Sequence, residues 1–134
     1  APQPEQIDPP SAVRITEGTN RRDKITGSKF NDEIYGYGGN DKIKGKKGDD
    51  LIDAGLGMKN KVKGGGGSDI FVLNNDAKVI IKDFDAFNDF LSLDGVTGET
   101  IQLQRKNNLL VLDNDGDVIA KITGQFDADQ INFI

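Results

Sequence analysis

A single apolar residue recurs about every nine positions between residues 18 and 72, against a background of Gly, Asn, Asp and Lys. The recurring residues are Ile25, Ile34, Ile43, Ile52, Val62 and Phe71. This spacing fits neither the period of about 3.6 residues of an amphipathic helix nor that of about 3.5 residues of a coiled coil. Each unit instead predicts a six-residue turn followed by a three-residue strand that points one side chain inward.

The units share Gly at position 1, Asp at position 6 and the apolar residue at position 8. They are GTNRRDKIT (18–26), GSKFNDEIY (27–35), GYGGNDKIK (36–44), GKKGDDLID (45–53) and GGGGSDIFV (64–72). A ten-residue unit, AGLGMKNKVK (54–63), interrupts the series and has Asn60 where Asp is expected. The position-6 residues of the full units are Asp23, Asp32, Asp41, Asp50 and Asp69. A flexible Gly-rich linker would have no reason to keep this register.

The pattern changes after residue 72, where glycine becomes rarer and apolar residues alternate with polar ones. This alternation predicts strands at 79–81, 90–93, 101–103, 109–112 and 118–122. Hairpin turns are expected at Asn107-Asn108 and Asp115-Gly116, and a short turn at 127–130. The fold class predicted is therefore all-β: a roll at 18–72 followed by a β-sandwich-like cap at 73–134. Residues 1–17, which include all four prolines, are expected to form an extended linker or tail.

Composition indicates that an apolar core alone would be thin, because apolar residues make up 35% of the chain. Typical globular domains contain roughly 45–50%. Small scaffolds with thin cores depend on disulfides, a metal or oligomerisation. The absence of Cys excludes disulfides and thiolate zinc sites, and the absence of His removes the commonest general base. The metal left to consider is one that takes oxygen ligands.

The repeat has the properties of a calcium site that forms between turns. Glycines let the backbone turn tightly, and the Asp of each turn supplies a charged oxygen. One turn cannot provide the six to eight or so oxygen ligands that calcium takes, whereas two stacked turns can. With two strands per coil, each turn would stack on the turn eighteen residues later, about one strand spacing away. Cations between the stacked carboxylates would replace repulsion with attraction, so calcium is expected to drive folding.

This pattern resembles the RTX family of glycine-rich nonapeptide proteins, whose repeat has the form G-G-x-G-x-D-x-U-x. The resemblance implies a parallel β-roll, Ca²⁺ between turns and export from bacteria by type I secretion in an unfolded state. It also implies ligands at carbonyls of positions 1 and 3 and at the side chains of positions 5 and 6. The site residues predicted in this way are Gly18, Asn20, Asp23, Gly27, Lys29, Asn31, Asp32, Gly36, Gly38, Asn40, Asp41, Gly45, Lys47, Asp49, Asp50, Gly64, Gly66 and Asp69.

Further features at the end of the chain resemble this family. Asp83 and Asp89 follow the final turn and are candidates to complete the last calcium site. The carboxyl-terminal segment 126–134 is acidic and then apolar, as in type I secretion signals, although a final core strand would have the same pattern. Asp113–Asp117 resembles the start of an EF-hand loop, but Val118 and Gly124 stand where that loop needs Gly and Glu. A hairpin turn is the preferred interpretation.

The function predicted is a non-catalytic calcium-binding module of a secreted or cell-surface bacterial protein. The alternative is an accessory module of a larger secreted enzyme, such as an alginate epimerase, protease or lipase, or of an adhesin. Extracellular polysaccharide or cell-surface components are candidate partners. The 22 acidic and 17 basic residues do not favour nucleic acid, and no stretch reaches the length of a membrane span. Lysines at 24, 42, 44, 46, 47, 59, 61 and 63 fit a surface for an anionic polymer or, as the preferred interpretation, a solvated face.

Overall fold

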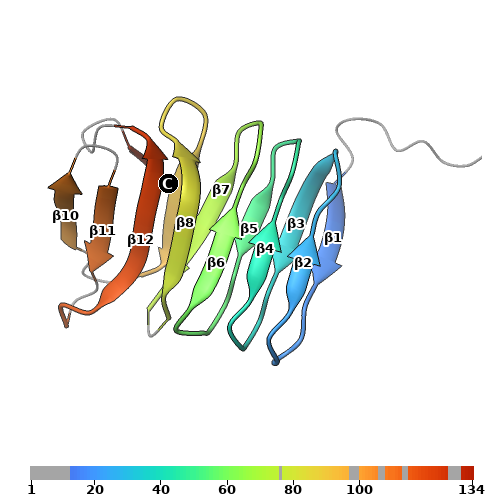
Figure 1. The fold of residues 1–134 in the computed structure, drawn as a ribbon, viewed down its shortest axis with the longest axis horizontal. Coiled ribbons are helices and arrows are strands. Elements are labelled where there is room, and N and C mark those ends of the chain that lie inside the picture. The colour runs from blue at the N-terminus through green and yellow to red at the C-terminus, as the bar shows by residue number, and fades with distance from the viewer. Residues whose placement is uncertain (1–12, 76, 97–99, 106–107, 113–114, 127–130) are drawn as a thin grey trace, which may run out of the picture.

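Two sheets face each other in a flattened roll, and through the nonapeptide units the chain crosses from one sheet to the other at every turn (Figure 1). The computed structural model describes residues 13–75, 77–96, 100–105, 108–112, 115–126 and 131–134. Within these ranges all regular elements are strands, which confirms the all-β prediction and the parallel β-roll. The described part of the chain accordingly contains no helix that could cross a membrane.

The first sheet is entirely parallel and collects alternate strands of the chain. Its order is β1 (Val13–Glu17), β3 (Asn31–Tyr35), β5 (Leu51–Asp53), β7 (Ile70–Asn74), β9 (Phe90–Gly95) and β13 (Asn132–Phe133). The second sheet has the order β10 (Thr100–Arg105), β11 (Asn108–Leu112), β12 (Val118–Gln125), β8 (Val79–Asp85), β6 (Asn60–Lys63), β4 (Lys42–Lys44) and β2 (Lys24–Thr26). From β1 to β10 sequential strands therefore alternate between the sheets, as two strands per coil requires, whereas β10, β11 and β12 lie together in the second sheet.

The register between neighbouring strands repeats the period of the sequence. Ile25 pairs with Ile43, eighteen residues on, and Ile34 pairs with Ile52 in the other sheet. The ten-residue unit changes this offset by one residue, so that Ile43 pairs with Val62. The extra residue is absorbed in the turn, and the inward direction of the strand is kept.

The position-8 side chains form the core, as the nine-residue pattern predicts. Ile34, Ile43, Ile52, Val62 and Phe71 are each at most 1% exposed. Aromatic rings close the core at the end of the roll nearest the cap: Phe71 packs on Phe84 and Phe84 packs edge-on against Phe126. Each coil adds only one large apolar residue per sheet, so the core between the sheets is thin.

The first strand corrects the last part of the tail expected at residues 1–17, because Val13–Glu17 is strand β1 and pairs in parallel with β3. Residues 1–12 lie outside the described residues. The apolar residues of β1, Val13 and Ile15, point outward and are 51% and 66% exposed. The inward position opposite Ile34 is taken by Thr16. Sequence reasoning missed the strand because its inward and outward residues are reversed relative to the repeat.

The carboxyl-terminal part extends both sheets of the roll. Strands β10, β11 and β12 form an antiparallel meander, and β12 joins the second sheet in parallel with β8. Strand β13 adds to the first sheet beside β9. The five strands predicted after residue 72 are all present, with longer bounds. The expected turn at 127–130, Asn107 of one hairpin, and Asp113 and Asn114 lie outside the described residues.

Candidate metal centres between stacked turns

The turns of the roll lie in two stacks, one along each side of the molecule. The first stack holds the turns that contain Asp23, Asp41 and Asn60, and the second stack holds those that contain Asp32, Asp50, Asp69 and Asp89. Backbone hydrogen bonds join successive turns, for example from the amide of Lys61 to the carbonyl of Asp41 at 2.8 Å. The predicted stacking of each turn on the next but one is therefore observed.

The position-6 carboxylates form a ladder within each stack. One carboxylate oxygen, Oδ1, accepts a hydrogen bond from the backbone amide of the equivalent residue in the preceding coil. In the first stack Asp23 donates to Asp41 at 2.8 Å and Asp41 donates to Asn60 at 2.8 Å. In the second stack the donors and acceptors are Asp32 to Asp50 at 2.8 Å, Asp50 to Asp69 at 3.0 Å and Asp69 to Asp89 at 3.0 Å. Asn60 and Asp89 thus occupy ladder positions although they lie outside the full units.

The second carboxylate oxygen, Oδ2, has no hydrogen-bond partner in three of these residues: Asp41, Asp50 and Asp69. These side chains are at most 2% exposed, so water does not solvate the oxygen. A buried polar atom without a partner is costly, and a buried carboxylate more so. Such an oxygen is a candidate ligand for a cation.

Position-1 glycines bring backbone oxygens close to these carboxylates. A Cβ atom on Gly36 would lie 2.7 Å from Oδ2 of Asp41 and 2.6 Å from the carbonyl oxygen of Ala54 in the next coil. A Cβ atom on Gly45 would contact Oδ2 of Asp50 and would lie 2.7 Å from the carbonyl oxygen of Gly64. Glycine is therefore required, because the space beside it holds a carboxylate oxygen and a carbonyl oxygen. These are the hard donors that calcium takes.

Burial also changes the proton affinity of the free carboxylates. Burial is the main cause that raises the pKa of Asp50 to about 7 and the pKa of Asp69 to about 8; neighbouring aspartates act in the same direction, and the ladder hydrogen bond to each carboxylate acts against it. The pKa of Asp41 is raised for the same main reason, burial. Without a cation, Asp50 and Asp69 are therefore substantially protonated near neutral pH. A divalent ion reverses that preference, because its charge favours the carboxylate.

The position-5 side chains connect turns through the backbone. Asn31 accepts a hydrogen bond from the amide of Asp49 at 2.7 Å, and Asp49 accepts one from the amide of Ser68 at 2.8 Å. Asn40 accepts from the amides of Met58 and Lys59 at 3.2 and 3.1 Å. These contacts give position 5 a structural role. Its role as a calcium ligand stays a prediction, as does that of the carbonyls at position 3: Asn20, Lys29, Gly38, Lys47 and Gly66.

The two acidic residues predicted to follow the last turn have different positions. Asp89 continues the second ladder, and burial raises its pKa to about 6. Asp83 contacts the start of the turn that contains Asp69, where it accepts hydrogen bonds from the amides of Gly64 and Gly65 at 2.9 and 2.8 Å. Among the described residues, no three acidic side chains gather into a metal cluster. The oxygen donors are instead single carboxylates, each combined with backbone carbonyls.

The model for the RTX calcium-binding nonapeptide repeat matches residues 17–52 in 4 copies. These units are RTX calcium-binding nonapeptide repeats. Their metal is calcium, and the unpartnered oxygens and close carbonyls fit that ion. The matched RTX segment includes two of the three free carboxylates, Asp41 and Asp50.

A solved structure supports the same fold over nearly the whole chain. The AlgE6R3 subunit of the mannuronan C5-epimerase from Azotobacter vinelandii is similar with a TM-score of 0.62 and 20% identity. The similarity covers 98% of this chain and 85% of that chain. At this identity the similarity shows the fold. The comparison with curated proteins gave no match.

Sequence reasoning missed two side chains in the RTX turns. Thr19 and Ser28, at position 2 of the first two units, donate hydrogen bonds to Asp23 and Asp32 through both the amide and the hydroxyl. The signal for this was present in the sequence, because these are the two full units without Gly at position 4.

Proposed function

We propose that this chain is a calcium-folded structural module of a secreted or cell-surface bacterial protein. The observation that carries the proposal is the set of three buried aspartate oxygens without a partner. In a low-calcium cytoplasm those charges would oppose formation of the roll, and the chain would remain unfolded for export. Calcium outside the cell would then bind between the turns and stabilise the fold.

The ion specificity of folding tests this function. Calcium accepts a large and irregular shell of oxygens, whereas magnesium requires a small octahedral shell and retains its waters. The metal-free chain should therefore fold with a calcium midpoint far below its magnesium midpoint, measured by circular dichroism. Equal midpoints for the two ions would contradict a site built from carbonyls and carboxylates of stacked turns.

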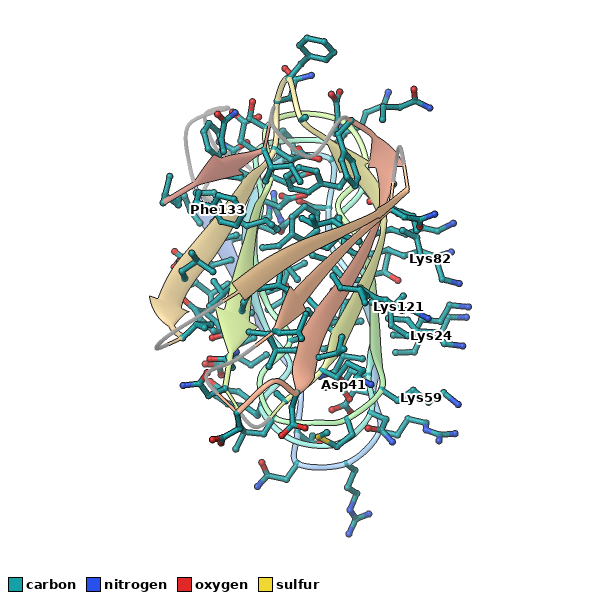
Figure 2. All side chains as sticks on the ribbon, turned by 90° about the vertical axis from the view of Figure 1, so that its left-hand side faces the viewer. Lys24, Asp41, Lys59, Lys82, Lys121 and Phe133 are labelled. Carbon is teal, nitrogen blue, oxygen red and sulfur yellow. The ribbon has the colours of Figure 1, made fainter. Side chains whose placement is uncertain are left out.

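The second candidate function is that of an accessory module that binds an acidic polysaccharide. Outward-facing lysines form in-register rows across the second sheet, where Lys24 pairs with Lys42, Lys42 with Lys61, and Lys44 with Lys63. Figure 2 shows Lys24, Lys82 and Lys121 pointing outward on the same side of the molecule. An open depression of about 460 Å³ adjoins these rows, lined by Arg22, Asp23, Lys24, Asn40, Asp41, Lys42, Lys59 and Lys61.

These lysine rows favour a linear polymer with regularly spaced negative charges. Like charges directly opposite one another on neighbouring strands are unfavourable unless an anion compensates them. The outward positions of β2, β4 and β6 are Lys or Thr, so this face lacks the aromatic side chains on which single-stranded nucleic acids stack. The similar fold of an epimerase subunit agrees with this accessory role. This similarity supports the fold, and the argument for an acidic polysaccharide as ligand rests on the lysine rows.

Binding of a short oligogalacturonate at saturating calcium tests the polysaccharide function, with a neutral oligosaccharide of equal length as the control ligand. Replacing Lys61 and Lys63 with Gln should weaken binding by about tenfold. Replacing Lys29 and Lys47, which lie in turns of the second stack, makes the same charge change and should leave binding nearly unchanged. Equal loss in the two double variants, or absence of binding by the original chain, would contradict this function.

A further inference from the structure

The ladder side chains are hydrogen-bonded differently in the end turns and in the middle turns of the two stacks. The end turns contain Asp23, Asp32, Asn60 and Asp89, and the middle turns contain Asp41, Asp50 and Asp69. In the first turn of the first stack, Oδ2 of Asp23 accepts hydrogen bonds from the amide and hydroxyl of Thr19 at 2.6 and 3.0 Å. In the first turn of the second stack, Oδ2 of Asp32 accepts the same pair from Ser28 at 2.8 and 3.0 Å. The equivalent oxygens of the middle turns are those without a partner.

Backbone conformation explains this difference. The middle turns have a left-handed glycine at position 4: Gly39, Gly48 and Gly67, with φ values of 85°, 99° and 100°. They also have a left-handed residue at position 2: Tyr37, Lys46 and Gly65. In these turns the position-2 amide donates no hydrogen bond to the carboxylate. The position-6 Oδ2 lies beside the position-1 glycine in all five full units, and in the middle turns no protein donor satisfies it.

The first turns cannot readily adopt that shape, because their position-4 residues are Arg21 and Phe30. A residue with a Cβ pays a steric cost in the left-handed region, and neither residue has a positive φ. Instead the hydroxyl at position 2 accepts a hydrogen bond from the position-4 amide, at 3.0 Å from Arg21 to Thr19 and at 3.0 Å from Phe30 to Ser28. The result is a Ser/Thr turn that satisfies the carboxylate within the same turn.

In the last turn of each stack, other groups make the hydrogen bonds that Thr19 and Ser28 make in the first turns. Asn60 accepts the ladder bond through Oδ1, and its Nδ2 donates to the carbonyl of Ala54 at 3.5 Å, so an amide donor is present where other turns leave an oxygen free. Asp89 accepts the ladder bond through Oδ1, and its Oδ2 accepts a hydrogen bond from the amide of Asp85 at 2.8 Å. Each stack is therefore closed at both ends by protein donors.

We infer that calcium is anchored by Asp41, Asp50 and Asp69, and that the end turns with Asp23, Asp32, Asn60 and Asp89 are metal-independent closures. This inference rests on the proposed calcium-dependent function and specifies its sites. It assigns one ion to the first stack and two to the second, one for each free aspartate oxygen. The end turns would separate the calcium-binding middle turns from solvent and from the remainder of the chain.

The number of bound calcium ions in native mass spectrometry tests this assignment, and two aspartates of one stack provide a matched pair. Asp32 and Asp50 are both 2% exposed and both at position 6, but only Asp50 has a free oxygen. The original chain should bind three ions, Asp50→Asn should bind two, and Asp32→Asn should retain three. Loss of an ion from Asp32→Asn, or more than three ions on the original chain, would overturn the assignment.

A gain-of-site variant covers the case in which Asp50→Asn does not fold. Replacing both Ser28 and Phe30 with Gly gives the second turn the glycine pattern of the middle turns and removes the hydroxyl closure. This double variant should bind four ions, and an unchanged count would overturn the inference. Complete absence of calcium binding in the original chain at millimolar calcium would instead reject the proposed function, so the two failures are distinguishable.

Discussion

At the scale of single residues, the position-6 aspartates are equivalent in sequence but not in structure. Asp50 and Asp69 have free buried oxygens in the same stack, so a calcium ion at either site would stabilise the other through the ladder. Asp41 has a free oxygen, but the next residue in its ladder is Asn60. Asp23 is half-exposed and accepts hydrogen bonds from Thr19. The same residue type therefore has different energetic consequences at each turn.

Alanine substitutions should reproduce this order in the calcium midpoint of folding. We expect Asp50→Ala to raise the midpoint most, Asp41→Ala less and Asp23→Ala least. Removing a charged ligand from a buried ion should cost several times the roughly 1 kcal/mol of an ordinary substitution. The three variants can be ranked by calcium titration followed by circular dichroism. Equal damage from Asp23→Ala and Asp50→Ala would contradict the stacking of turns described here.

The raised pKa values predict how calcium affinity depends on pH. Asp50 and Asp69 have folded-state pKa values of about 7 and about 8 in place of the ordinary 3.8, so the metal-free roll holds protons that the unfolded chain releases. The metal-free roll therefore loses stability as pH rises from about 4 to about 8. Calcium must displace those protons from the folded roll, whereas the unfolded chain has already released them above about pH 4. The affinity of the folded roll for calcium should therefore increase as pH rises through this range, and in chelator the chain should show more β structure by circular dichroism near pH 5 than near pH 8. Identical spectra in chelator at the two pH values would contradict protonation of these carboxylates in the metal-free roll.

At the scale of single elements, each coil depends on one inward apolar residue and one special turn. The left-handed conformation at position 4 is the feature that only glycine provides without strain. A Cβ atom on Gly48 would also contact the carbonyl oxygen of Phe30 in the preceding coil. The turn is therefore constrained both by its own backbone and by its neighbour in the stack.

Two glycine substitutions separate these constraints from loss of glycine in general. Gly48→Ala should destabilise the calcium-bound roll by roughly 1–3 kcal/mol, the range for a strained backbone position. Gly66→Ala is the control, because Gly66 lacks a positive φ and its Cβ would meet no atom within 4 Å among the described residues. Urea unfolding at saturating calcium would measure both. Similar losses at the two positions would contradict the role assigned to the left-handed turn.

The sequence was sufficient to predict the roll because its two signals are strictly local. Ile at position 8 determines the inward face, and Gly with Asp determines the turn, so register and stacking follow from the nine-residue period. Strand β1 was missed because Thr16 takes the inward position and the apolar Ile15 faces outward. The hydrogen bonds of Thr19 and Ser28 to the aspartates have a signal in the sequence, the missing Gly at position 4, but the bonds themselves depend on the backbone conformation of the turn, which the nine-residue pattern does not specify.

At the scale of the whole molecule, stability is divided between a thin apolar core and the bound ions. Each strand of the repeats contributes one large side chain to the core, whereas three buried carboxylate oxygens oppose folding when no cation is present. The cap provides a second source of stability, since β12 joins the second sheet and Phe126 packs against Phe84. Calcium would thus control the repeats more strongly than it controls the cap.

The circular dichroism spectrum of the chain with and without a calcium chelator tests the central claim most directly. In chelator at neutral pH the spectrum should be that of a largely disordered chain, because the core is thin and the buried carboxylates are unpaired. Addition of millimolar calcium should produce the spectrum of β structure, and renewed chelation should reverse it. A well-folded β spectrum that is unchanged by chelator would contradict the claim that calcium drives the folding of this roll.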